Sequence, residues 1–105
     1  MEHVRQGDIL EFSKPSMYAL VLSRDFFNRS GMAVLCPIVK CSTEDALHFP
    51  IHAERIQGVV LCEQLKAIDL RARFYRIISS ISVEQLQDIC DAVQDIFAYY
   101  PFSIL

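Results

Sequence analysis

Long hydrophobic runs are absent from this sequence of 105 residues, and the residues typical of flexible or low-complexity chains are few. The longest uncharged stretches, residues 30–39 and 96–105, reach only ten residues, whereas a membrane-spanning helix needs about 20. Three glycines and four prolines are too few for a linker or a low-complexity protein. The first residues contain no apolar run of the kind that forms a signal peptide. We therefore expect a soluble, cytoplasmic protein with no membrane contact.

Intrinsic disorder is excluded as well, because hydrophobic residues make up 52% of the chain and charged residues 22%. A chain of this length forms a single domain, which we expect to span residues 1–105. So small a domain has a thin hydrophobic core, and partner surfaces often add to the stability of such proteins.

The sequence also has no Cys-x2-Cys pair, so it offers no standard metal site. Cys36 and Cys41 stand one residue outside the usual ligand spacing. Pro50 prevents a helix that would bring His48 and His52 onto one face, and on a strand they would stand about 13 Å apart. Three cysteines lie in apolar runs, where we expect free, buried thiols: Cys36, Cys62 and Cys90. We expect no metal ion.

Basic residues are missing beyond Arg76, where four acids follow: Glu84, Asp88, Asp91 and Asp95. Residues 1–76 carry ten bases and nine acids, so a charge of +1 there and −4 in the tail give the net −3. The acidic tail would repel phosphate, whereas a local group of bases before it could attract phosphate. The bases of that group are Lys66, Arg71, Arg73 and Arg76. A plain solvated surface is the alternative explanation.

The first two-thirds of the chain predict short strands, because apolar or alternating runs are separated by residues that favour turns. These runs cover residues 8–12, 18–23, 32–39, 48–52 and 58–64, with shorter ones near 67–69 and 75–78. Residues 26–31 predict a loop or a single helical turn. Short strands at this spacing suggest a small barrel.

The last third predicts one amphipathic helix over residues 83–100, because its apolar residues recur with helical period. Ser82 and Gln85 have the spacing of a capping box at its start, and Pro101 ends the pattern. The acids of the tail fall on the opposite face. The apolar stripe is Val83, Leu86, Cys90, Val93, Phe97 and Tyr100, widened by Ile89 and Ile96.

Several motifs follow one another along nearly the whole chain: GDI at 7–9, ALVLS at 19–23, FNRSGM at 27–32, CPI at 36–38, FPI at 49–51 and GVVLCEQLKAID at 58–69. The most specific is EQLKAID at 63–69. In this order they resemble the MazF/PemK toxins of bacterial type II toxin–antitoxin systems, which have a CcdB-like fold. The resemblance implies an SH3-like β-barrel with a C-terminal helix, a homodimer and an antitoxin partner. It also implies cleavage of single-stranded mRNA without metal or cofactor.

The sequence departs from this family where the chemistry of cleavage is expected. Met17 and Tyr18 stand where members carry an Arg-Pro pair, and Val39 stands where they carry a threonine. In the family the arginine and threonine move the 2′-hydroxyl proton and stabilise charge on phosphorus, which neither a thioether nor an isopropyl group can do. The Gly-rich loop before the Arg-Pro pair is also reduced to residues 13–16. Lys14 and Lys40 are the nearby residues that could substitute.

We therefore expect a toxin-fold protein that has lost the family's catalysis and acts by binding a partner protein or nucleic acid. The alternative is an active, metal-free, sequence-specific mRNA endoribonuclease and growth inhibitor with rearranged catalytic residues. The expected partners are an antitoxin, single-stranded RNA or DNA, and a second copy of the chain, held through residues 32–36 or 97–102. Gln64 and Lys66 share parity on one predicted strand and could line a residual pocket. The residues expected to bind are Asn28, Arg29, Gln64, Lys66, Arg71 and Arg73.

Overall fold

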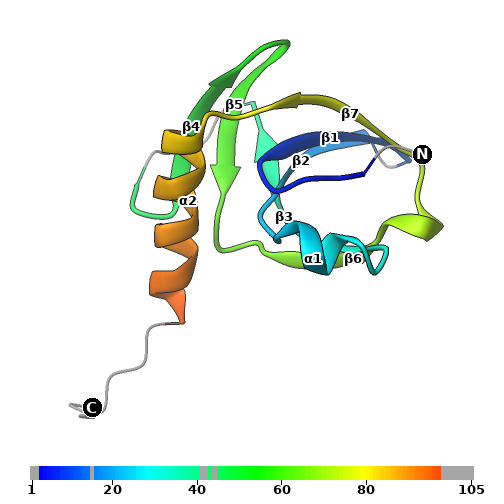
Figure 1. Ribbon diagram of the computed structural model, residues 1–105. Helices are drawn as coiled ribbons and strands as arrows, with labels where there is room; N and C mark the ends of the chain where they lie inside the picture. Colours follow the sequence, from blue (N-terminus) through cyan, green and yellow to red (C-terminus); the bar gives the residue numbers. More distant parts are fainter. Residues whose placement is uncertain (1–2, 15, 41–42, 44, 98–105) are drawn as a thin grey trace.

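The computed structural model describes residues 3–14, 16–40, 43 and 45–97, and these residues are mainly β (Figure 1). The strands are β1 (Asp8–Ser13), β2 (Ser16–Val21), β3 (Met32–Val39), β4 (His48–Ala53), β5 (Ile56–Leu61), β6 (Lys66–Asp69) and β7 (Tyr75–Ser80). The helical elements are the single turn α1 (Asp25–Asn28), the 3-10 turn η1 (Leu70–Ala72) and α2 (Val83–Ile96). The prediction of a mainly β protein with a C-terminal helix is confirmed.

The strands form one antiparallel sheet in the order β4-β5-β3-β2-β1-β7, with β6 also paired to β3. Figure 1 shows this sheet curling, with α2 beside β4 and β5. β3 is covered along both edges, because β2 pairs with one and β5 and β6 share the other. Ala33, Leu35 and Cys36 on this strand are fully buried within the chain. These three side chains are therefore unavailable to a second copy, although residues 32–36 were expected to offer it a surface.

Strand alternation gives the sheet two apolar cores, one on each side. On β2, for example, Leu20 points to one side and its neighbours Ala19 and Val21 to the other. The helix-side core consists of Ile9, Leu20, Leu22, Cys36, Ile38, Ile51, Val60, Cys62, Ile89 and Ala92. The opposite core consists of Val4, Leu10, Phe12, Ala19, Val21, Ala33, Leu35 and Leu70.

α2 begins where the capping pattern predicts, because the Ser82 hydroxyl oxygen accepts the Gln85 N–H at 3.2 Å. Its middle turns cover the helix-side core, where Ile89 is 1% exposed. The ends of the helix extend past that core, so Val83 is 74% and Phe97 69% exposed. α2 ends at Ile96, and the predicted continuation to residue 100 lies outside the described residues. None of the described helices is long and apolar enough to cross a membrane.

One strand boundary at the expected site is corrected, because Gln64 lies in a turn after β5 and not on a strand. On β3, Ile38 faces Val60 of β5. Three residues earlier, Leu35 faces Lys66, where an unbroken partner strand would place residue 63. Three residues therefore leave the pairing, and a 3.1 Å hydrogen bond from the Gln64 N–H to the end of β5 closes the turn. Gln64 and Lys66 thus do not share a strand.

Candidate functional site

The two positions where the resemblance places catalytic residues lie at the same end of the neighbouring strands β2 and β3. β2 and β3 pair with Tyr18 opposite Ile38, and the next step along this register places Met17 across from Val39. Alternation directs both to the side of the opposite core, against which Met17 packs. The sheet therefore assembles the expected site, but it fills the site with a thioether and an isopropyl group, which neither transfer a proton nor carry charge.

The connection before Met17 is as short as the sequence predicts. Ser13 of β1 pairs with Ser16 of β2, so only two residues separate the strands. Lys14 in this turn is exposed, and so is Lys40, which follows the last residue of β3. Both flank the site along the chain, and their part in any chemistry stays a prediction.

Val39 is fixed in place by a close approach of two strands. A Cβ atom on the buried Gly58 of β5 would lie 2.6 Å from the Val39 carbonyl oxygen and 2.9 Å from Ile38 Cγ2. A larger residue would force β5 away from β3 at this point. The backbone at position 39 is thus tightly held, and the identity of its side chain alone determines what chemistry it offers.

Two of the four predicted basic residues are neutralised by acids. Tyr18, Glu11 and Arg76 form one row across β2, β1 and β7. Arg76 Nε donates to Glu11 Oε1 at 3.0 Å, and the Tyr18 hydroxyl donates to Oε2 at 3.1 Å. The Arg76 guanidinium and then the Tyr18 hydroxyl hold the pKa of Glu11 below its usual value. Arg71 Nε likewise lies 2.9 Å from Asp69 Oδ1 and lowers the pKa of that carboxyl group.

Arg73 differs from these neighbours, because no described residue forms an ion pair with it. Its Cζ atom lies 4.8 Å from the centroid of the Phe12 ring, a cation–π contact. Phe12 is 1% exposed, and the Tyr75 ring lies 6.2 Å from it between centroids. Arg73 therefore covers the opposite core at the end nearest the site. Lys66, opposite Leu35, is exposed at the start of β6.

Asn28, predicted to bind RNA or a partner, is buried and uses its amide within the chain. Its Nδ2 donates to the carbonyl oxygens of Ser23 at 2.9 Å and Val4 at 3.4 Å. The Ser23 hydroxyl donates to Asn28 Oδ1 at 2.5 Å. These contacts tie α1 to the end of β2 and to the segment before β1. Arg29, the next residue, is exposed, and binding by either residue stays a prediction.

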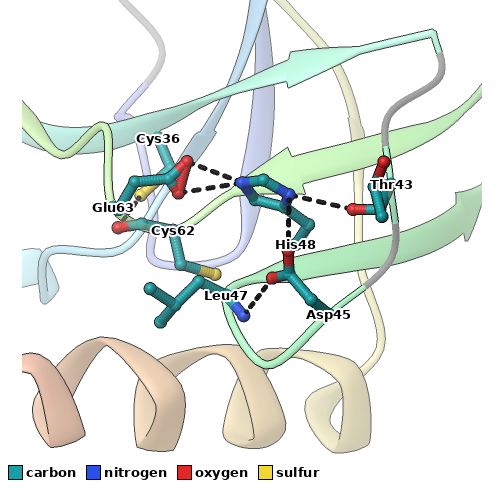
Figure 2. A network of polar contacts seen from close by, with 7 residues as sticks. All are labelled: Cys36, Thr43, Asp45, Leu47, His48, Cys62 and Glu63. Carbon is teal, nitrogen blue, oxygen red and sulfur yellow. Dashed lines mark hydrogen bonds and ion pairs between the residues drawn. The ribbon is translucent and has the colours of Figure 1, made fainter.

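Sequence reasoning missed a polar cluster centred on His48, at the start of β4 (Figure 2). His48 Nε2 lies 2.7 Å from Glu63 Oε1, and Nδ1 lies 2.9 Å from the Thr43 carbonyl oxygen and 3.3 Å from Asp45 Oδ2. The β4–β5 hairpin brings Glu63 within reach, because His48 faces Leu61 across it. The hairpin register is the signal that could have revealed this pair.

The contacts of the His48 ring favour its imidazolium form. A carbonyl oxygen and a carboxylate only accept hydrogen bonds, so the ring satisfies both when each nitrogen carries a proton. The hydrogen bond to Glu63, and then that to the Thr43 carbonyl, raise the pKa of His48 above its ordinary value of 6.5. His48 thus joins the chain before β4 to the turn after β5 through both of its ring nitrogens, forming a clasp.

The cysteines behave as apolar residues. Cys36 and Cys62 are buried free thiols, and burial raises their pKa values to about 12 and about 11. Cys90 is free as predicted but only half-buried, and Cys41 lies outside the described residues. Among the described residues, no group of three His, Cys, Asp or Glu side chains could hold a metal ion.

Known proteins share this fold and sequence pattern. The family model described as "PemK-like, MazF-like toxin of type II toxin-antitoxin system" matches residues 11–97. The endoribonuclease toxin ChpB of Escherichia coli (strain K12) is 33% identical over 75 residues, which cover 67% of this chain and 65% of ChpB, just under two-thirds of that relative.

Two solved structures extend the similarity of fold. The MazE-MazF crystal structure (Form-I) from Deinococcus radiodurans matches with a TM-score of 0.84 at 19% identity, over 92% of this chain and 98% of that one. An endoribonuclease from mycobacterial species matches with a TM-score of 0.81 at 10% identity, over 96% of this chain and 98% of that one. Because the family model covers most of the sequence, this chain belongs to the PemK-like, MazF-like toxins of type II toxin–antitoxin systems.

Proposed function

We propose that this protein is a toxin-fold component of a toxin–antitoxin pair that binds an antitoxin protein and single-stranded RNA, and does not cleave RNA by the family's reaction. The observation that carries this proposal is that Met17 and Val39, next to the paired residues Tyr18 and Ile38 on β2 and β3, occupy the two positions expected to carry catalytic residues. Removal of one charge-stabilising donor slows an enzyme by about 10²–10³-fold, and loss of an acid–base group by about 10²–10⁴-fold. Either loss alone makes cleavage hard to detect.

An RNA assay tests this proposal directly. Purified protein is incubated with a long unstructured RNA in a chelator, and binding and strand breaks are measured together. We expect a salt-sensitive complex and intact RNA, because the remaining cations neutralise phosphates without moving protons. The double variant Met17→Arg with Val39→Thr should restore only a trace of cleavage, since the substrate loop is still short. Specific cleavage by the unmodified protein would contradict the proposal.

Binding of an antitoxin is supported by the similar structures, which include MazE-MazF from Deinococcus radiodurans and a mycobacterial endoribonuclease in complex with its cognate antitoxin. A small acidic open reading frame beside the gene is the expected source of the partner. The two proteins should co-purify when they are expressed together, and recovery of each alone would count against the pair.

We also propose a homodimer, since so small a chain has a thin core and the resemblance implies a two-fold dimer. Sedimentation at tens of micromolar should give twice the chain mass of 12.0 kDa. A monomer at that concentration would contradict this expectation.

The second candidate function is that of an active endoribonuclease with rearranged catalytic residues. The 33% identity to a protein named as an endoribonuclease toxin favours it. In that case RNA fragments with free 5′-hydroxyl ends should form in chelator. Cleavage that disappears in Lys14→Ala or Lys40→Ala would identify the substitute residue, with Arg55→Asn in the exposed β4–β5 turn as a control for lost charge.

A further inference from the structure

We propose that Arg73, seated on the Phe12 ring, is the anchor of a phosphodiester-binding site that supplies beside Met17 the positive charge missing from β2. This inference rests on the RNA binding proposed above and names the residue that contacts the RNA backbone. It assigns to Arg73 a role distinct from those of the other bases nearby.

The charges around Arg73 single it out. Arg71 is paired with Asp69, and Arg76 with Glu11, so each of these arginines brings a compensating negative charge with it. Within the described ranges, Arg73 has neither an ion-pair partner nor a hydrogen-bond acceptor for its guanidinium. A half-buried cation without a carboxylate is an attractive site for an anion from solution.

The contact of the Arg73 guanidinium with the Phe12 ring favours a phosphate ligand in particular. The Phe12 ring attracts the cation through its face but accepts none of its N–H groups in ordinary hydrogen bonds. Those donors stay available to oxygen atoms, and the planar guanidinium fork matches two oxygens of a phosphodiester. Phe12 is itself fixed, since it is 1% exposed and its ring lies against Tyr75. Arg73 is therefore restrained before a ligand arrives.

The position of the Phe12 ring, on which the Arg73 guanidinium lies, connects Arg73 with the expected site. Phe12 of β1 faces Met17 of β2 directly, and side chains so paired stand about 4.5–5.5 Å apart at Cβ. Arg73, in the chain segment between η1 and β7, thus supplies the positive charge that the resemblance leads one to expect on β2. Glu11, the adjacent acid on β1, bonds to Tyr18 on the helix side of the sheet. The Glu11 carboxylate therefore lies on the other side of the sheet from the Phe12 ring and Arg73.

The test measures RNA affinity by fluorescence anisotropy with a labelled 12-nucleotide single-stranded RNA in chelator. The central variant is Arg73→Met, which removes the charge and keeps an apolar stem over Phe12. Arg71→Met is the matched control, because it removes the same charge from a neutralised pair. Thermal melting of each variant confirms that the fold is kept.

We expect Arg73→Met to weaken binding about tenfold and to lower the slope of log affinity against log salt by about 0.7. Arg71→Met should weaken binding less than threefold, and Arg73→Lys should fall between, because it keeps the charge and loses the planar fork. Equal losses for Arg73→Met and Arg71→Met would overturn the anchor while leaving RNA binding intact. No binding by the unmodified protein would overturn the proposed function as well.

A rescue experiment tests the location. Adding Met17→Arg to Arg73→Met should restore most of the lost affinity, since it returns the positive charge to the facing position on the neighbouring strand. The matched control adds Lys14→Arg, which changes no charge and should restore nothing. A folded Met17→Arg, Arg73→Met protein that binds RNA no better than Arg73→Met would overturn the claim that Arg73 replaces a charge at position 17.

Discussion

The two sides of the sheet use the same alternating strands for different purposes. On the helix side, the middle of α2 seals the core, Arg76 is neutralised by Glu11, and the exposed acids of α2 face solvent. On the opposite side, Met17 and Val39 lie at the same end of β2 and β3, and Arg73 covers Phe12 with no acid of the described residues paired to it. The exposed acids of α2 and the unpaired Arg73 therefore lie on opposite sides of the sheet, a separation that the net charge of −3 does not reveal.

The largest effect on stability should come from removing core packing on the helix side of the sheet. Ile89→Ala removes a buried side chain that joins α2 to the sheet, so the free energy of unfolding should fall by about 2–5 kcal/mol in urea denaturation. Val83→Ala on the same helix, where the side chain is 74% exposed, should change it by about 0.5 kcal/mol or less. Equal losses would contradict the assignment of the middle of α2 as the part that holds the helix to the sheet.

An intermediate effect is expected at Asn28, which holds the opposite core to α1. Asn28→Ala leaves the Val4 and Ser23 carbonyl oxygens without this donor, so the free energy of unfolding should fall by about 1–3 kcal/mol. Arg29→Ala, at the exposed neighbouring position, is the control and should have little effect. Unchanged stability combined with weaker RNA binding would instead assign Asn28 to the ligand.

The smallest effect should be a pH-dependent one at the His48 clasp, at the start of β4. Because the folded pKa of His48 is raised above 6.5, its contribution is full below the unfolded pKa and is lost as the pH rises through the folded pKa. The difference in stability between the unmodified protein and His48→Gln should thus be largest in mild acid and shrink above neutrality. His52→Gln, an exposed histidine on the same strand, is the control; a difference that grows with pH would refute the imidazolium.

Much of the fold follows from local sequence pattern. Alternating apolar residues located the strands, the 3.6-residue period and Ser82 located α2, and the short connection at Lys14 was readable from length alone. These features depend on residues that are close to one another along the chain, and the sequence shows such residues directly. The resemblance to the toxin family likewise came from linear motifs, and the match of the family model to residues 11–97 confirms it.

Sequence alone determined which bases this protein has, but only the tertiary structure decided which of them are neutralised. Glu11 and Arg76 are 65 residues apart and meet because β1 and β7 pair in a register that shifts between Ile9 and Leu10. The same kind of long-range registration placed Gln64 in a turn, closed the His48 clasp and set Arg73 over Phe12. Coulomb and cation–π energies depend on distance in space, and strand register, which no local pattern specifies, sets that distance.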